Sequence, residues 1–439
     1  MQTRQLVFTH RHWQQARQTL FSRANCEGFA FALARPCKRN HGLAYIVEHV
    51  LEPGDSDYEQ RSAGGLTTSL AFSNRINQIA ADAANHGLAP VHLHSHPPGV
   101  ENFSSYDDKH ERMLHQWLQS QGQPLLLSVV QAPDAQPRAR LWLNKQTQPL
   151  TLRQGLQIVT AETAPALPAL SRQNAFGRGL KAAARHLQIG IVGVGGIGML
   201  VAEQLARAGF CRFVLIDHDR IEPSNLNRLP GCTEQDLGRF KVKTAKTQIQ
   251  RICRAVGTRS EVHAFVEDIY TAPDQVKNVL RQCDVILALT DNELSRIACL
   301  DLAFDGGAEF LMAGVDIRLN EAGEIQGLFA EVSGAEAGRY CPMCTGRLDS
   351  GQASLDARRY VGGEVWDKAQ SEGYIRDIPD PSVMSLNAMA AGALVLEIQR
   401  RVAGLGVRDL WQMDYQHGTV LTYEKIERYT EEECGVCNA

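Results

Sequence analysis

The feature that most constrains the fold is a glycine-rich turn between an apolar run and a predicted helix in the middle of the chain. The turn lies within IGIVGVGGIGMLVAEQLARAGF, residues 189–210, and its glycines are Gly193, Gly195, Gly196 and Gly198. Glycine lets backbone N–H groups approach a phosphate at the start of a helix. Asp217 ends the next apolar run, where its carboxylate can bind ribose hydroxyls. With a further apolar run at 284–289, this order predicts an α/β fold with a Rossmann-like, doubly wound parallel sheet.

An Ala/Pro-rich stretch divides the chain into two parts. AETAPALPAL, residues 161–170, has the composition of a linker, and 439 residues suffice for two or three domains. The part before the linker mixes predicted helices and strands without the regular order of a parallel sheet, which indicates an α+β domain. We expect one domain at 1–158, a linker at 159–170 and the domain with the glycine turn at 171–439.

Charge and hydropathy exclude two classes of partner. The net charge of −4 and the pI near 6.4 describe a slightly acidic chain, whereas proteins that hold nucleic acid by bulk charge are normally basic. We find no run of 18 apolar residues, which a membrane-spanning helix requires, and no apolar segment of a secretory signal near the N-terminus. We expect a cytoplasmic protein that binds neither nucleic acid nor a membrane.

The first part carries a histidine-rich run that is typical of a metal site. In VHLHSHPPGVENFSSYDD, residues 91–108, the histidines His92, His94 and His96 alternate. Residues two apart on a strand share one face, so the three imidazoles project together. Two imidazoles and a carboxylate make a three-ligand zinc site with one open position for water, which zinc activates at neutral pH.

This run resembles the signature HxHx7SxxD of the JAMM (MPN+, or JAB-like) zinc metalloproteases. His94, His96, Ser104 and Asp107 match it in register. The resemblance implies that His94, His96 and Asp107 hold a catalytic Zn²⁺ and that Ser104 donates a hydrogen bond to the oxyanion of the tetrahedral intermediate. A register shifted by one residue, with Ser105 and Asp108, is a minor alternative.

The family also has a glutamate upstream of this run, on an earlier strand. Glu27, followed by the small and apolar run GFAFAL, fits that position best, and Glu48 and Glu52 are the competitors. The resemblance implies that this glutamate is the general base that acts on the zinc water.

Three segments after Asp217 distinguish a triphosphate site from a dinucleotide site. They are EPSNLNR, which contains Asn225 and Arg228, LGRFK, which ends at Lys241, and TDN, which contains Asp291. A dinucleotide has no need of this arginine and lysine. A triphosphate does, because the two cations neutralise its charge while the aspartate holds Mg²⁺.

The ordered segments resemble the ThiF/MoeB-like superfamily, which includes the ubiquitin-activating (E1-like) enzymes. The resemblance implies ATP binding by the glycine turn, Asp217, Asn225, Arg228, Lys241 and Asp291. It also implies adenylation of the C-terminal glycine of a ubiquitin-like carrier protein, with release of pyrophosphate. Upstream, SRQNAFG matches a family segment whose arginine, here Arg172, reaches the ATP of the partner subunit. A homodimer through this domain is therefore implied.

Four of the eleven cysteines form two CxxC pairs, Cys341 with Cys344 and Cys434 with Cys437. In a reducing compartment such pairs indicate zinc before a disulfide. In the family they form one structural site of four cysteines, so the resemblance implies a second, structural Zn²⁺. A redox role for the CxxC pairs is the alternative.

No cysteine lies between Cys344 and Cys434, where thioester-forming relatives carry their nucleophile. The usual thioester is therefore excluded at that place, and three routes remain. The adenylate could pass directly to the cysteine of a conjugating enzyme. A serine, namely Ser350, Ser354 or Ser382, could form an oxyester, or Cys232 could substitute. We expect this charged, glycine-containing segment to be mobile.

The two parts together predict a bifunctional enzyme of a ubiquitin-like pathway. The JAMM-like domain would trim a carrier precursor or remove the carrier from conjugates, and the ThiF-like domain would adenylate the trimmed tail. Fusions of this kind resemble those of bacterial ubiquitin-like pathways, often tied to phage defence. Two alternatives stay open: activation of a sulfur carrier for cofactor synthesis or tRNA thiolation, and a non-catalytic scaffold that binds a ubiquitin-like protein.

Overall fold

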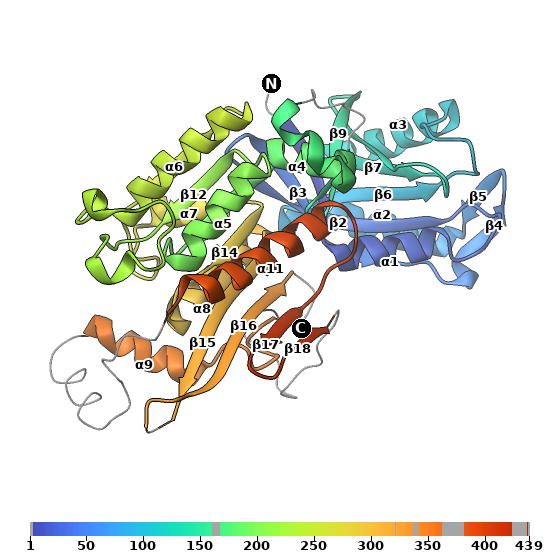
Figure 1. Ribbon diagram of the computed structural model, residues 1–439. Coiled ribbons are helices and arrows are strands. Elements are labelled where there is room, and N and C mark those ends of the chain that lie inside the picture. The colour runs from blue at the N-terminus through green and yellow to red at the C-terminus, as the bar shows by residue number, and fades with distance from the viewer. Residues whose placement is uncertain are drawn as a thin grey trace. The chain divides into compact units, whose positions relative to one another are not determined.

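The chain folds into two compact units, Met1–Thr163 and Ala164–Ala439, which we describe separately. The computed structural model (Figure 1) describes residues 3–159, 167–320, 322–336, 341–361, 382–423 and Cys437. Among these residues no helix has the length and the hydropathy that a bilayer crossing requires.

The first unit is built on a mixed eight-stranded sheet. Its strand order is β1-β3-β2-β6-β7-β8-β9-β10, and β1 also pairs in parallel with β9, so the sheet closes on itself. The strands are β1 (Thr3–Phe8), β2 (Phe29–Arg39), β3 (Gly42–Leu51), β6 (Ala89–Ser95), β7 (Leu125–Gln131), β8 (Arg138–Leu143), β9 (Gln146–Gln154) and β10 (Gln157–Val159), with a separate hairpin of β4 (Tyr58–Ser62) and β5 (Gly65–Thr68). Helices and short 3-10 turns complete the unit: α1 (His10–Leu20), α2 (Leu70–Asp82), α3 (Ser105–Ser120), η1 (Asp55–Asp57) and η2 (Ala83–His86).

Strand β6 lies inside this sheet, antiparallel to β2 and parallel to β7. Val91 and Leu93 are fully buried in the core that α1 covers with Trp13. Because side chains alternate along a strand, His92 and His94 face the other side. The apolar residues of β6 thus fix the direction of its histidines.

The described residues of the second unit form an eight-stranded sheet of order β13-β12-β11-β14-β15-β16-β17-β18. The pairs from β13 to β15 are parallel and the remaining pairs are antiparallel. The strands are β11 (Gln188–Val192), β12 (Arg212–Ile216), β13 (Glu261–Phe265), β14 (Val285–Ala288), β15 (Glu309–Leu319), β16 (Ile325–Ala335), β17 (Leu410–Asp414) and β18 (Thr419–Tyr423). The helices are α4 (Gly177–His186), α5 (Gly196–Arg207), α6 (Lys241–Val256), α7 (Asp274–Arg281), α8 (Glu293–Gly306), α9 (Ser350–Val361) and α11 (Met384–Val402), and the 3-10 turns are η3 (Pro168–Phe176), η4 (Pro223–Asn225) and η5 (Glu234–Asp236).

The parallel strands give the doubly wound α/β arrangement that the glycine turn predicts. The order in which strands join the sheet reverses between the parallel neighbours β11 and β14, and ligands of such sheets bind at the carboxyl ends of the strands at this point. Helix α5 starts directly after β11 and packs against α11 (Figure 1). The turn between β11 and α5 needs glycine at Gly193, because its φ is +88° and a Cβ there would lie 2.6 Å from the Leu289 carbonyl oxygen.

The segment after Cys344, which the sequence predicts to be mobile, contains the helix α9 at residues 350–361. The Asp356 carboxylate of α9 accepts a hydrogen bond from the backbone N–H of Glu293 at the start of α8 (2.9 Å). This contact ties α9 to α8, and the mobility of the segment stays a prediction. Residues 362–381 of the same segment lie outside the described residues.

Candidate functional site

A pocket of about 500 Å³ opens at the carboxyl ends of the parallel strands in the second unit. Of the residues predicted for the ATP site, Gly193, Gly195, Gly196, Asp217, Arg228, Lys241 and Asp291 line it. The pocket is therefore assembled from the glycine turn, the end of β12, the segment after η4, the start of α6 and the end of β14. It lies where a doubly wound sheet binds its ligand.

Three predicted residues do not line this pocket. Gly198 packs α5 against the turn, because a Cβ at this position would lie 2.0 Å from the Gly193 carbonyl oxygen. Asn225 is buried and accepts a hydrogen bond from the Glu222 N–H (3.2 Å), which closes η4. Arg172 is exposed on η3, and its predicted role needs a partner subunit, so it stays a prediction.

The charged groups of the pocket are held by specific bonds. The Asp217 carboxylate accepts the N–H groups of Val194 (2.7 Å) and Asp219 (2.8 Å), and so ties β12 to the glycine turn. Burial raises the pKa of Asp217 above its ordinary value, and the Lys241 ammonium opposes this. Lys241 forms an ion pair with Asp219 (Nζ to Oδ2, 2.7 Å). Arg228 is half-buried and donates to the Ser224 carbonyl (2.7 Å). Two cations thus face a pocket with Asp291 in its wall.

The structure also brings residues into the pocket that sequence reasoning missed. They are Asn387 near the start of α11, Arg296 of α8 and Asp316 of β15, and they line the pocket together with Ser382, which the sequence offers only as a candidate nucleophile. Asn387 is 2% exposed and bonds to Ser382 (3.1 Å). Asn387 places a polar amide within the apolar sequence of α11, and this could have marked it as a candidate site residue from the sequence. Asp316 and Arg296 had no comparable signal, because only the fold brings them near Gly193.

We expect Gly198→Ala to destabilise the second unit. The added Cβ clashes with backbone and not with a flexible side chain, so overpacking should cost about 1–3 kcal/mol in the free energy of unfolding. Urea unfolding of the full chain measures this. Gly195→Ala is the matched control, because its Cβ would meet nothing within 4 Å and its φ of −81° suits alanine. Equal stability of Gly198→Ala and the unaltered protein would contradict the close packing.

In the first unit, His94, His96 and Asp107 come together. His94 Nε2 lies 3.2 Å from His96 Nε2 and 3.2 Å from Asp107 Oδ1, and His96 Nε2 lies 3.2 Å from Asp107 Oδ2. A tetrahedral zinc ion with bonds of about 2.0–2.1 Å separates its nitrogen and oxygen ligands by about 3.3–3.4 Å. The separation of the two histidine nitrogens is close to this value, and Asp107 contacts them with different carboxylate oxygens. One ligand atom of each residue lies within 4.8 Å of the other two, so the three residues fit a zinc ion.

Ser104 and Asp107 are linked as the capping box of α3. Ser104 Oγ and the Ser104 N–H both donate to Asp107 Oδ2 (2.7 and 2.6 Å), and the Asp107 N–H donates back to Ser104 Oγ (3.2 Å). Burial acts to raise the pKa of Asp107, but hydrogen bonds from His94 and His96 outweigh it and hold the pKa well below its usual range. Asp107 is therefore ionised, as a zinc ligand must be.

The three candidate glutamates differ in their surroundings. Burial raises the pKa of Glu27 against the opposing charges of His96 and His94, which places Glu27 beside the histidines. Glu48 pairs with Arg35, and Glu52 accepts hydrogen bonds from Gln15 (2.6 Å) and Thr19 (2.8 Å). These contacts favour Glu27 as the base. Asp108, the aspartate of the alternative register shifted by one residue, forms an ion pair with Arg140.

His92 belongs to a second, neighbouring group. One ligand atom each of His92, His94 and Glu111 lies within 4.8 Å of the other two, and His92 Nδ1 is 3.9 Å from Glu111 Oε1. Glu111 is fully buried on α3 and pairs with Arg140. Sequence reasoning missed Glu111 and Arg140, since neither belongs to the JAMM-like signature.

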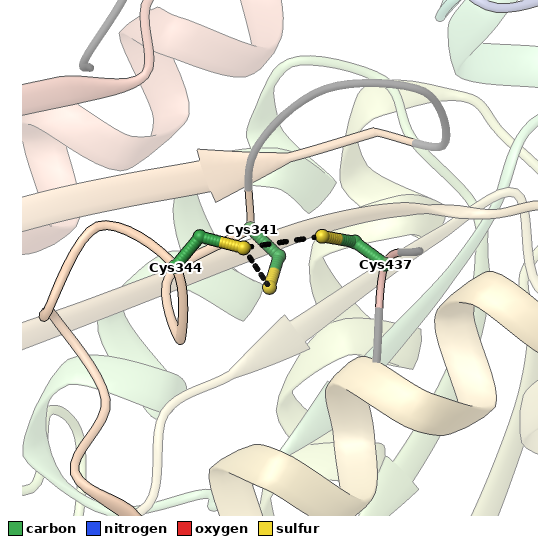
Figure 2. Close-up of side chains that lie close together, drawn as sticks. All are labelled: Cys341, Cys344 and Cys437. Carbon is green, nitrogen blue, oxygen red and sulfur yellow. Dashed lines mark hydrogen bonds between the residues drawn. The ribbon is translucent and has the colours of Figure 1, made fainter. Parts of the chain in front are cut away.

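Cys341, Cys344 and Cys437 gather in the second unit (Figure 2). The sulfur of Cys344 lies 3.8 Å from that of Cys341 and 3.2 Å from that of Cys437, too far for a disulfide. The fourth predicted ligand, Cys434, lies outside the described residues. Zinc–sulfur bonds of about 2.3 Å place thiolates about 3.8 Å apart, which the Cys341–Cys344 pair matches, whereas the Cys344–Cys437 pair is closer. The three sulfurs gather within 4.8 Å of one another, as candidate ligands of one metal ion.

We expect Cys341→Ser to lose one zinc ion per chain and to lower the unfolding temperature, because structural zinc contributes folding free energy. Metal analysis and thermal denaturation measure both effects. Cys232→Ser is the control, since Cys232 lies elsewhere, against Met199 and Gln248. Retention of all zinc in Cys341→Ser would contradict a structural zinc site.

The structure also describes the surroundings of the cysteine and the serines that could replace the missing nucleophilic cysteine. Cys232 is half-buried, and burial raises its pKa, which disfavours the thiolate. Ser354 donates to the Ser350 carbonyl within α9 (2.8 Å). Of the three candidate serines, Ser382 lines the pocket.

Comparison with known proteins identifies the second unit. The sequence profile of the ThiF family matches residues 170–436, more than half of the chain. The chain belongs to the ThiF family. Family relatives include the adenylyltransferase and sulfurtransferase MOCS3 of Arabidopsis thaliana, 33% identical over 25% of this chain and 23% of that protein. The ubiquitin-like modifier-activating enzyme 5 of Caenorhabditis elegans is 33% identical over 26% of this chain and 28% of that protein.

The chain thus spans about a quarter of the length of these two curated relatives. Among solved structures, E. coli MccB with ATP covers 93% of this ThiF-family chain and 99% of its own chain, at 14% identity and a TM-score of 0.46.

Proposed function

We propose that the ThiF-family unit uses ATP to adenylate the C-terminal carboxylate of a ubiquitin-like protein. The observation that carries this is the pocket of about 500 Å³ that joins the glycine turn to Arg228, Lys241 and Asp291. A carrier protein of this kind, Mg²⁺, and a homodimer that would supply Arg172 are parts of the proposal.

In this reaction a carboxylate oxygen of the carrier attacks the α-phosphorus of ATP, and the bond to the β-phosphate oxygen breaks, which releases pyrophosphate. The N–H groups at the start of α5 and the cations Arg228 and Lys241 stabilise the phosphate charge. Lys241 would exchange its partner Asp219 for phosphate. Asp291 would hold Mg²⁺, which neutralises the leaving pyrophosphate. The residues act by position and charge.

Pyrophosphate release tests this proposal. Full-length protein, ATP and Mg²⁺ are mixed with a small ubiquitin-fold protein that ends in glycine, and with the same protein lacking that glycine. We expect release with the first alone. Release with neither carrier, although calorimetry detects ATP binding, would contradict carboxylate adenylation.

We also propose that the first unit is a JAMM-like zinc peptidase that trims the carrier or removes it from conjugates. The close grouping of His94, His96 and Asp107, with one ligand atom of each within 4.8 Å of the others, carries this proposal. Zinc, when bound, lowers the pKa of water to near neutrality. Glu27 would take the proton of that water and give it to the leaving amine. Ser104, whose hydroxyl hydrogen bonds to Asp107, would redirect this hydrogen to the oxyanion.

The two activities would act in series, since trimming exposes the carboxylate that adenylation consumes. With no cysteine between Cys344 and Cys434, we propose that the adenylate passes to the cysteine of a conjugating enzyme. The MOCS3 relative favours a second candidate, activation of a sulfur carrier. A thiocarboxylate product, detected by mass spectrometry when a sulfur donor is added, would select the second candidate.

A further inference from the structure

The segment that carries Ser104 and Asp107 belongs to a helix, whereas His94 and His96 lie on and just after a strand of the sheet. Strand β6 is held on both edges by β2 and β7. Helix α3 has no such ladder, so side-chain contacts must fix its position. Its buried residues are Glu111, His115 and Leu118. Two of these three are polar, and a charged, directional contact fixes the rotation of a helix better than an apolar one.

The directional contact comes from strand β8. Arg140 donates from Nε to Glu111 Oε2 (2.8 Å), and its Nη2 lies 2.7 Å from the same oxygen. Trp142 Nε1 donates to that oxygen as well (2.7 Å). Glu111 is fully buried and the Arg140 side chain is 11% exposed. The pair is thus shielded from solvent and closely defined.

The same guanidinium contacts both sides of the turn that carries the site residues. It lies over the ring of Phe103, 3.8 Å from the centroid, and Phe103 directly precedes Ser104. It also pairs with Asp108, which directly follows Asp107. The Phe103 ring in turn packs edge-on against His94 (6.1 Å between centroids). One side chain of β8 therefore contacts both the residue before Ser104 and the residue after Asp107, and so holds the Ser104–Asp107 turn on both sides.

We propose that Arg140 is a positioning residue of the metal centre. It holds the Ser104–Asp107 turn so that the Asp107 carboxylate meets His94 and His96. This inference rests on the proposed zinc peptidase function. Arg140 does not act on substrate itself, because its guanidinium is occupied by Glu111, Asp108 and the Phe103 ring.

The test compares full-length variants. Arg140→Met combined with Glu111→Gln removes both charges, so that no buried carboxylate is left without its partner. Arg138→Met is the matched control: it lies on the same strand two residues earlier, and its ion pair with Glu101 is longer (3.6 Å) and exposed. The measurements are zinc affinity by chelator competition, kcat and KM for a carrier precursor, and melting followed by circular dichroism. The zinc lost in His96→Ala identifies the site.

We expect the double variant to melt cooperatively. Its zinc affinity at this site should fall 10- to 100-fold, as is typical when a group that orients a metal ligand is removed. Its kcat should fall while its KM stays within twofold. Arg138→Met should match the unaltered protein, and Arg140→Lys should be intermediate. Unchanged zinc affinity in the folded double variant, or an equal loss in Arg138→Met, overturns the inference.

Two outcomes need separate treatment. If the double variant does not fold, Phe103→Leu removes the stacking contact but keeps the ion pair, and unchanged zinc affinity in that variant overturns the inference. If the unaltered protein and His96→Ala bind equal amounts of zinc, the proposed zinc function itself fails, and the inference fails with it. Zinc binding in the unaltered protein thus distinguishes the two failures.

Discussion

Asp291→Ala should lower ATP-dependent pyrophosphate release by roughly 10²- to 10³-fold, the loss typical of a group that stabilises transition-state charge. Asp291 follows β14 and lines the pocket beside the glycine turn. Without its carboxylate, Mg²⁺ would lose the ligand proposed for it, and the charge of the leaving pyrophosphate would be less well neutralised. A coupled pyrophosphate assay with saturating carrier measures the effect, and cleavage by the first unit should be unchanged.

Asp305→Ala is the control, because Asp305 lies at the end of α8 and pairs with Arg281 (3.4 Å) on the surface. It removes the same charge from the same unit. Equal losses in the two variants would indicate a general charge effect, and full activity of Asp291→Ala would remove Asp291 from the site.

Glu27→Gln should lower zinc-dependent cleavage of a carrier precursor by roughly 10²- to 10⁴-fold, the usual contribution of a general base. Glutamine keeps the shape of the side chain but cannot take a proton. Zinc content should not change, since His94, His96 and Asp107 remain. Pyrophosphate release with a carrier that is already trimmed should also be normal. Cleavage followed by mass spectrometry and metal analysis together measure these effects.

Glu52→Gln and Glu48→Gln serve as matched controls for the same substitution. Both residues are engaged with partners of their own, so cleavage should persist. A large loss in either control, with normal cleavage by Glu27→Gln, would reassign the base. A loss in none of the three would mean that the chemistry of the unit differs from the JAMM-like reaction.

Local sequence patterns predict the elements whose residues carry their own signals. The apolar run at 284–289 contains the strand Val285–Ala288, and the helix predicted after the glycine turn is Gly196–Arg207. Both carry a local pattern of apolar residues, which depends only on neighbouring residues. Strands β1 and β9 escape such prediction, because TRQLVF and QTQPLTLRQ mix polar and apolar residues and become strands by pairing across the sheet.

The sites show the same division. The JAMM-like signature places His94, His96 and Asp107 within one short stretch, so the sequence alone brought them together. Asn387 and Lys241 line one pocket, but they are distant in sequence and meet only through the fold. Supporting groups such as Arg140 carry no signature at all, because an arginine on a strand is typical of a surface position until its partners are known.

The closed sheet of the first unit has a consequence for how the chain is made. Gln5 of β1 pairs with Thr151 of β9, so the first strand of the unit meets one of its last. Pairing between such distant segments is slow, because loop closure precedes the contacts that reward it. On the ribosome, β1 and β3 can pair early, but the closing pair cannot form until β9 has emerged. The first unit is therefore completed only as synthesis of the second begins.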